Sequence, residues 1–476
     1  MNRTKPIVGV IGTTGVGKSK LGIELSKLLN GEVINSDAMQ MYKGFPIITN
    51  KVTKEECDGV KHHLLDFINI SEEYNVKDFV PLALEKINEL HTSDKLPIVV
   101  GGTHYYVQSL IWDTRQIPIE TKLEAEKVEN HPILNKVETM TNEELHAALE
   151  AVDPEMASHW HPNDRRKIIR SLEVFYTTNK KQSDWFLEQE KGHDLEEITR
   201  FPTLLFWLFS DKKDLDKRLD DRVDEMVKLG LFDELDELKS EINNMPGDAS
   251  EFEKGIKQSI GFKAFEQYLN LKSELTSKTN DDNIKDIEKE LELSREEGLK
   301  TMKTQTRRYA KRQVKWIEHQ ILPLHFKLQL KENSSDHNKV NIFLLDATDL
   351  SKWKENVFDK ALEITKKFLN NESLPDPVTL NVPASKFFKL KDTTKSGPTF
   401  VGWKKRTCEE CSRRIDKDTG KLVAPVVLNG DQEWEAHIKS RSHRKQVGYN
   451  RKWSLQVIDV DGGDKKRANV EDSEDK

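Results

Sequence analysis

Eight consecutive residues near the start of the chain carry the pattern that most directly predicts chemistry. They read Gly12-Thr13-Thr14-Gly15-Val16-Gly17-Lys18-Ser19 and match the phosphate-binding loop G-x-x-x-x-G-K-[ST] in full. An apolar, strand-like run precedes the loop and a helical pattern at 20–29 follows it, as this motif requires. Backbone N–H groups at the helix start attract an anion, Lys18 adds a positive charge, and the Ser19 hydroxyl can ligate Mg²⁺. The loop therefore predicts a site for a di- or triphosphate.

Asp37 is a candidate for the cleft beside this loop, because it directly follows a predicted strand at 32–36. In open α/β sheets, ligands gather at the carboxyl ends of strands. From the local sequence alone, a helix-capping role for Asp37 fits equally well. The strand at 96–100 ends in Gly101-Gly102-Thr103, where ATPases with such a loop often carry a carboxylate. Its absence favours a phosphate that leaves during the reaction, although small-molecule kinases can also lack this carboxylate.

Arg222 is a cation on the apolar stripe of a predicted helix. The stripe is formed by Leu215, Leu219, Val223 and Met226, and Arg222 follows Leu215 by seven residues. A charge that points inward needs a partner or an anion. Two interpretations stay open: an ion pair with one of the neighbouring aspartates, or contact with a bound phosphate.

Two short segments concentrate positive charge in a chain whose formal net charge is -7. Residues 303–316 contain six Lys and Arg residues and no acid, with Tyr309 and Trp316 interleaved; residues 164–170 form a shorter basic cluster. Such segregation predicts a track for a polyanion. A solvated helix face is the simpler alternative for a short charge run.

Cys408, Cys411, His437 and His443 form the pattern C-x₂-C…H-x₅-H, which is close to a two-Cys, two-His zinc site. The histidines lie six residues apart, so an ideal helix would place them about 240° apart. We therefore expect the helix to bend or open between them if both bind one metal. Residues 437–452 contain six cations and no acid, which predicts contact of this module with RNA backbone.

These residues require an α/β frame, because apolar runs alternate with helical patterns as in a parallel sheet. We predict a P-loop NTPase-like parallel sheet with helices on both faces, an inserted helical lobe and a small C-terminal zinc finger. The expected division is a catalytic core at 1–112 and 201–330, the lobe at 113–200, a core extension and linker at 331–400, the finger at 401–455, and a disordered tail at 456–476.

The composition limits the class of protein. The chain has 476 residues, 33% charged and 36% hydrophobic, which fits a protein of two or three domains with a polar surface. It contains no run of 18 apolar residues, so no membrane span is expected. A strand begins within six residues of the start, which leaves no room for a leader and predicts a cytosolic protein. The finger is compatible with a nuclear pool, and mitochondrial delivery would require an upstream start.

Seven blocks, in order, resemble the tRNA dimethylallyltransferases of the eukaryotic type, which carry a matrin-like or U1-like zinc finger. Together they span some three hundred residues, which makes the resemblance specific. Two departures, Thr13 in the loop and His104-Tyr105-Tyr106, remove no chemical group. The blocks lie at 12–19, 35–42, 62–66, 101–106, 161–173, 258–262 and 306–316.

The resemblance implies transfer of a dimethylallyl group from dimethylallyl diphosphate to N6 of the adenosine immediately 3′ of the anticodon, with release of diphosphate. It implies that the loop at 12–19 holds the diphosphate, that Asp37 accepts the proton, and that Thr14 lies near the reacting groups. Lys18, Arg222 and a Mg²⁺ on Ser19 would stabilise the leaving group.

The resemblance also implies contacts with the anticodon stem-loop of a tRNA, and a monomeric enzyme. The alternative is a P-loop kinase for a nucleotide or small metabolite with an RNA-binding finger; a third possibility is a non-enzymatic RNA-binding protein with a vestigial loop. The residues expected to contact tRNA are Asp37, Met39, Gln40, Thr103, Arg166, Gln258, Arg307, Arg308, Lys311 and Arg312.

Overall fold

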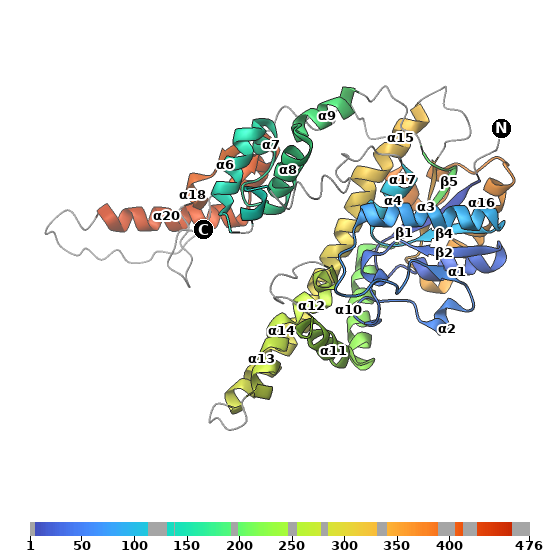
Figure 1. Cartoon of the computed structure of the whole chain (residues 1–476), viewed down its shortest axis with the longest axis horizontal. Coiled ribbons are helices and arrows are strands. Elements are labelled where there is room, and N and C mark those ends of the chain that lie inside the picture. The colour runs from blue at the N-terminus through green and yellow to red at the C-terminus, as the bar shows by residue number, and fades with distance from the viewer. Residues whose placement is uncertain are drawn as a thin grey trace, which may run out of the picture. The chain divides into compact units, whose positions relative to one another are not determined.

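The structure, a computed structural model, divides the chain into two compact units. One unit comprises residues 1–114 and 196–391, and the other comprises residues 115–195 and 392–476 (Figure 1). The residues that the structure describes are 5–112, 131–137, 139–191, 199–245, 255–277, 284–330, 340–388, 405–412 and 426–458.

A six-stranded parallel sheet forms the centre of the first unit, and its strand order is β3-β2-β4-β1-β5-β6. The parallel α/β fold is therefore confirmed. The phosphate-loop strand β1 is internal, with Val8 opposite Ile98 on β4 and Leu204 on β5. β3 was not predicted, because two residues are too few for a periodic pattern. The strands are β1 (Ile7–Gly12), β2 (Gly31–Asn35), β3 (His62–His63), β4 (Leu96–Val100), β5 (Thr203–Phe209) and β6 (Val340–Asp346).

Helices cover both faces of the sheet, as predicted (Figure 1). Successive side chains of a strand point to opposite faces. On β1, Ile7 and Ile11 join the core under α3 (Val76–Thr92) and α4 (His104–Ile111), while Val8 and Val10 join the core under α1 (Lys18–Leu28) and α16 (Asp359–Leu369). The other helices of this unit are α2 (Lys54–Cys57), α10 (Lys212–Lys228), α11 (Leu231–Asn243), α12 (Ile260–Ala264), α13 (Glu266–Ser277), α14 (Ile284–Trp316), α15 (Leu322–Leu330) and α17 (Val382–Phe387).

The segment after α16 packs on the sheet, although part of it was expected to be a linker. Asn381 Nδ2 donates to the carbonyl of Leu344 on β6 at 2.7 Å. The Phe387 ring lies 4.7 Å from the ring of Trp207 on β5, between centroids. The apolar residues of α17 therefore belong to the core. The remainder of the expected linker, 389–400, lies outside the described residues.

The second unit contains a helical lobe and a small finger. The lobe is helical throughout 131–191 where it is described, and Leu145, Leu149, Met156, Ile168 and Leu172 are buried in its own core. The finger pairs two short antiparallel strands and adds three helices. Of the expected tail, only 456–458 are described, and they end a helix. The elements are α6 (Asn142–Val152), α7 (Pro154–His159), α8 (Arg165–Thr178), α9 (Gln182–Lys191), β7 (Lys405–Thr407), α18 (Glu409–Ser412), β8 (Val427–Asn429), α19 (Gly430–Ile438) and α20 (Arg441–Ile458).

In neither unit is a described helix both long and apolar enough to cross a membrane.

Replacing Phe387 with alanine tests the packing of α17. The change removes the contact with Trp207, so we expect the free energy of unfolding of the core to fall by about 2 kcal/mol. Val382→Ala is the matched control on the same helix, because Val382 is 69% exposed and should change the free energy of unfolding by at most about 0.5 kcal/mol. Urea unfolding of both variants decides the matter, and equal stabilities would show that α17 is only loosely attached.

Candidate active site and metal cluster

The phosphate-binding loop is tightly enclosed between β1 and α1. Gly15 and Gly17 have φ angles of 80° and 91°, which are left-handed values that favour glycine. A Cβ on Gly17 would lie 2.7 Å from the indole ring of Trp353, and a Cβ on Gly15 would lie 2.8 Å from Leu219 of α10. The glycines of the motif are therefore required by space as well as by backbone conformation.

Asp37 caps a short helical turn and also faces the phosphate-binding loop. Its Oδ1 accepts a hydrogen bond from the N–H of Met39 at 3.2 Å, at the start of the 3₁₀ turn Ala38–Met41. Its Oδ2 lies 3.1 Å from the position of a Cβ on Gly102, and Lys18 Nζ lies 3.6 Å from the same position. The two sequence interpretations of Asp37 are thus compatible, because one carboxylate oxygen serves the cap and the other faces Lys18.

Burial changes the acidity of both charged groups. Burial lowers the pKa of Lys18 to about 8, although Asp37 raises it and the charge of Arg222 lowers it further. Burial also raises the pKa of Asp37, while Lys18 and the backbone N–H groups of Met39 and Gly102 act in the opposite direction. A basic carboxylate and an easily deprotonated ammonium group are thus neighbours at the edge of the sheet.

Arg222 is half-buried on α10 and lies close enough to Lys18 for the like charges to repel. Among the described residues it makes no hydrogen bond or ion pair, so the ion pair considered from the sequence is not found. Arg218, four residues earlier on the same helix, differs from Arg222 because it donates to the carbonyls of Ala347 and Thr348. Arg222 is attracted by Glu56 and Glu225, and Lys18 by Asp37, so each cation has acidic neighbours. The two cations still lie close enough to repel each other near the loop, an arrangement that suits an anion.

Gln313 joins the loop to the neighbouring strand end, and sequence reasoning did not select it. Its Oε1 accepts from the N–H of Thr14 at 2.9 Å, and its Nε2 donates to the carbonyl of Gly102 at 2.9 Å. Gln313 is only 4% exposed and lies within the basic segment of α14. In the sequence, the one available signal was a neutral polar residue within a run of cations.

His104 is a second residue that the sequence analysis did not select for the site. Its Nε2 lies 3.2 Å from both the backbone nitrogen and the backbone oxygen of Gly12. Burial lowers the pKa of His104 to about 3, and the charge of Lys18 acts in the same direction. The neutral imidazole therefore contacts the backbone of Gly12, the first residue of the loop, without adding charge to the site.

The predicted tRNA-contacting residues of the first unit that lie outside α14 differ in how the protein holds them. Thr103 Oγ1 accepts from the N–H of Ala38 at 3.0 Å, and Gln40 Nε2 donates to the carbonyl of Asn50 at 2.8 Å. Met39 is half-buried and packs against the core. Gln258 is exposed and accepts from Lys263 Nζ. The side chains of Thr103 and Gln40 are thus already engaged in hydrogen bonds with the protein backbone.

Some cations in the basic segment of α14 pair with acidic residues of the protein, and the others are exposed to solvent. Lys303 pairs with Asp224 at 2.7 Å, and Arg307 pairs with Asp220; both carboxylates belong to α10. Arg307 therefore has its charge partly used within the protein. The other cations of the segment remain exposed: Arg308, Lys311, Arg312 and Lys315.

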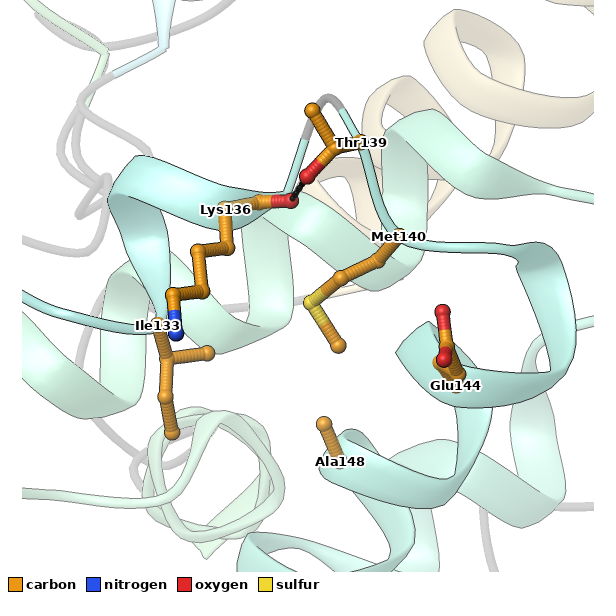
Figure 2. Close-up of a pocket in the computed structure, with 6 residues that line it drawn as sticks. All are labelled: Ile133, Lys136, Thr139, Met140, Glu144 and Ala148. Atoms are coloured by element: carbon orange, nitrogen blue, oxygen red, sulfur yellow. Dashed lines mark hydrogen bonds between the residues drawn. The ribbon is translucent and has the colours of Figure 1, made fainter.

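Arg166 lies in the second unit, exposed near the start of α8. The same lobe has a pocket of about 430 Å³, which contains none of the predicted site residues (Figure 2). Glu144 on its wall accepts from the N–H of Thr141 and caps α6. We assign no function to this pocket, whose lining is Ile133, Lys136, Thr139, Met140, Glu144 and Ala148.

Cys408, Cys411, His437 and His443 come together in the finger, and their ligand atoms all lie within 4.8 Å of one another. His443 Nδ1 lies 3.4 Å from Cys411 Sγ and 3.1 Å from His437 Nε2. A tetrahedral zinc ion spaces its sulfur and nitrogen ligands by about 3.5 Å. The cluster therefore has the ligand types and the spacing to hold a metal such as zinc.

The expected opening of the helix between the two histidines is confirmed. α19 ends at Ile438, one residue after His437, and α20 begins at Arg441. Ser440 Oγ accepts from the N–H of His443 at 3.1 Å and so caps the second helix. The break turns the two imidazoles, which an unbroken helix would separate, toward one point.

Chemically, the first unit can bind a phosphate-bearing anion at Lys18 and Arg222, and it can accept a proton at Asp37 beside it. Comparison with known proteins identifies the family. A model of the IPP transferase family matches residues 40–320. The chain is 36% identical over 451 residues to the tRNA dimethylallyltransferase of Saccharomyces cerevisiae, and the match covers 94% of each chain. The chain belongs to the tRNA dimethylallyltransferase family.

Other family members support the same assignment. The human tRNA dimethylallyltransferase is 33% identical over 468 residues, which cover 97% of this chain and 90% of the human chain. A crystal structure of a eukaryotic dimethylallyltransferase acting on tRNA is similar to this structure with a TM-score of 0.72 and 34% identity. That similarity covers 96% of this chain and 100% of the solved one. The predicted resemblance is confirmed, and the kinase alternative is not favoured.

Replacing Cys408 with serine tests the metal cluster. Removing one thiolate from four ligands should abolish tight binding, so elemental analysis should fall from about one zinc per wild-type chain to near zero. Cys57→Ser is the matched control, because Cys57 is the one described cysteine outside the cluster and its loss should leave the zinc content unchanged. Equal zinc contents in the Cys408→Ser variant and the wild type would overturn this ligand assignment.

Proposed function

We propose that the chain transfers a dimethylallyl group from dimethylallyl diphosphate to N6 of the adenosine immediately 3′ of the anticodon in tRNA, with release of diphosphate. The observation that carries the proposal is the pairing of an anion site with a buried carboxylate: Lys18 and Arg222 converge on the loop, and Asp37 faces the same point. Family membership supports the donor and the acceptor. The missing carboxylate after β4 agrees with a phosphate group that leaves.

The carboxylate of Asp37 removes the proton that the adenine must lose. The exocyclic N6 is a weak nucleophile, because its lone pair is delocalised into the ring. As the new C–N bond forms, the bond between the allylic carbon and the diphosphate oxygen breaks, and its electron pair leaves with the diphosphate. The proton from N6 passes to Asp37, whose raised pKa makes it a better proton acceptor than a solvated aspartate.

The loop stabilises the leaving diphosphate. Backbone N–H groups at the start of α1, the Lys18 ammonium and the Arg222 guanidinium are fixed before the charge develops, so they need little reorganisation. Among the described residues, the Ser19 hydroxyl makes no hydrogen bond within the protein and is available to ligate Mg²⁺. When bound there, Mg²⁺ would neutralise part of the diphosphate charge.

The tRNA would approach the edge of the sheet at which Asp37 lies. The target base must leave its stack for N6 to reach a carboxylate enclosed by protein. Gln40, Thr103 and the exposed cations of α14 would then contact the anticodon stem-loop, with Arg166 and the finger as further contacts. We propose a monomeric protein of the cytosol, with a nuclear pool that the RNA-binding finger would suit.

Two labelled donors distinguish the proposed reaction from the kinase alternative. Dimethylallyl diphosphate labelled in its carbon chain should transfer the label to tRNA without any nucleotide, and label from the γ-phosphate of ATP should not move. Asp37→Asn should lower the rate by about 10²- to 10⁴-fold, because it removes the proton acceptor. Asp58→Asn is the control, since Asp58 pairs with Lys27 elsewhere on the surface and its loss should leave the rate unchanged.

The pH dependence of kcat/KM for the donor should follow the two shifted groups. Lys18 loses its charge as the pH rises through about 8, so kcat/KM should fall tenfold per pH unit above that value. On the acid side, Asp37 becomes protonated below its raised pKa, so kcat/KM should fall at a higher pH than a solvated aspartate would give.

Lys18→Arg provides the control for the alkaline limb. A guanidinium stays protonated far above pH 8, so the residual activity of this variant should lose the decline near pH 8. A decline that persists at the same pH in Lys18→Arg would assign the alkaline limb to another group.

A further inference from the structure

Two exposed aromatic side chains touch each other beside the proposed active site. Tyr105 is 43% exposed and Trp316 is 37% exposed, and their ring centroids lie 5.8 Å apart with the planes at 64°. Across the described parts of the chain, Tyr449 in the finger is the one other Phe, Tyr or Trp with comparable exposure. Large rings that stay in solvent keep most of the free-energy cost of exposing apolar surface. A pair of such rings is therefore expected to bind a ligand.

The position of this aromatic pair is fixed from both sides. Trp316 Nε1 donates to Gln108 Oε1 at 3.0 Å, which ties the last residue of α14 to α4. Tyr105 lies at the start of α4, where the next residue, Tyr106, turns inward and stacks on Phe79 with ring centroids 4.9 Å apart. Tyr105 is therefore held at the surface by its helix.

The aromatic pair lies next to the residues around Asp37. Thr103, two residues before Tyr105, accepts from the N–H of Ala38, which follows Asp37. On α14, Trp316 lies three residues after Gln313, which donates to the carbonyl of Gly102. Residues three apart share one helix face, so Trp316 lies roughly one helical turn from the buried Gln313, on the same side of α14.

Several exposed cations precede Trp316 on the same helix. Arg308, Lys311, Arg312 and Lys315 are exposed on the last turns of α14. The guanidinium of Arg312 lies 5.8 Å from the ring of Tyr309 on the same helix. Exposed rings among several cations are the arrangement that binds unpaired nucleotides, in which bases stack on rings and phosphates meet cations.

We propose that Tyr105 and Trp316 form a stacking platform for an unpaired base of the anticodon loop next to the adenosine that is modified. The platform replaces, with protein rings, part of the stacking that the loop loses when the target base is extruded. The inference rests on the proposed function, since it takes the same tRNA as its ligand. It adds a contact that reads no particular base, because every base has a flat π face.

Binding of an anticodon stem-loop RNA to full-length variants at several salt concentrations tests the platform. Tyr105→Leu keeps an apolar contact with Trp316 but removes the planar face, and Tyr105→Phe keeps the face. We expect Tyr105→Leu and Trp316→Ala each to weaken binding by roughly 5- to 150-fold, with Tyr105→Phe close to wild type. The KM for dimethylallyl diphosphate should stay unchanged in all three.

The salt dependence separates stacking from charge. Loss of a ring should leave the slope of log affinity against log salt unchanged, whereas Lys315→Gln should reduce that slope by about 1. Melting temperatures identify any variant that fails to fold. If Trp316→Ala fails to fold, Tyr105→Leu decides the test, because it alters a surface residue. Wild-type RNA affinity in a folded Tyr105→Leu variant would overturn the platform.

The prenyl-transfer assay keeps the two hypotheses apart. If wild-type protein transfers the labelled dimethylallyl group but the ring variants bind RNA normally, the platform is wrong and the proposed function stands. If the ring variants lose RNA affinity but the wild type transfers no label, the platform stands as an RNA contact and the proposed reaction is wrong.

Discussion

The phosphate-binding loop at the end of β1 depends on holding two like charges near each other. Lys18 and Arg222 lie close enough to repel, while Asp37 attracts Lys18, and Glu56 and Glu225 attract Arg222. Cations held in this way are stable where packing keeps them in place and an anion can approach them. The protein meets the first condition with Trp353 and Leu219 against the loop, and with the neutral His104 beneath it. In the proposed reaction the diphosphate would meet the second condition, and its binding would relieve the repulsion between Lys18 and Arg222.

The same edge of the sheet carries the sites proposed for the two substrates. Gln313 bonds to Thr14 in the loop and to Gly102 beside Asp37, and it belongs to the helix that presents free cations to solvent. A shift of α14 on contact with RNA would therefore be felt at both hydrogen bonds. Under the proposed function, this arrangement would couple tRNA binding on α14 to the loop that holds the donor, in addition to the contact at the reacting atoms. Such a connection is useful to an enzyme that must not lose its allylic group to water before the acceptor is present.

Local patterns were enough to predict the strands at 32–36 and 96–100, the loop and the open helix of the finger, because each depends on neighbours in sequence. Pairings between distant segments were not predictable. The internal ion pair of Arg307 requires Asp220, which lies 87 residues earlier, and the role of Gln313 requires a loop 299 residues away. Charge and spacing in the sequence indicated a basic track, but the fold decided which of its cations remained free. The α17 segment likewise joined the core through Trp207, which no local period could indicate.

The enclosure of the loop by late parts of the chain has a consequence for synthesis. β1 lies between β4 and β5 in the sheet. β5 pairs on its other side with β6, which ends at Asp346. Trp353, which covers Gly17, comes later still. At ribosomal rates of about 5–20 residues per second, roughly 20 s to 1 min pass between the emergence of the loop and that of its cover. During this interval the apolar central strand and the anion site are made but lack the late segments that enclose them in the folded protein.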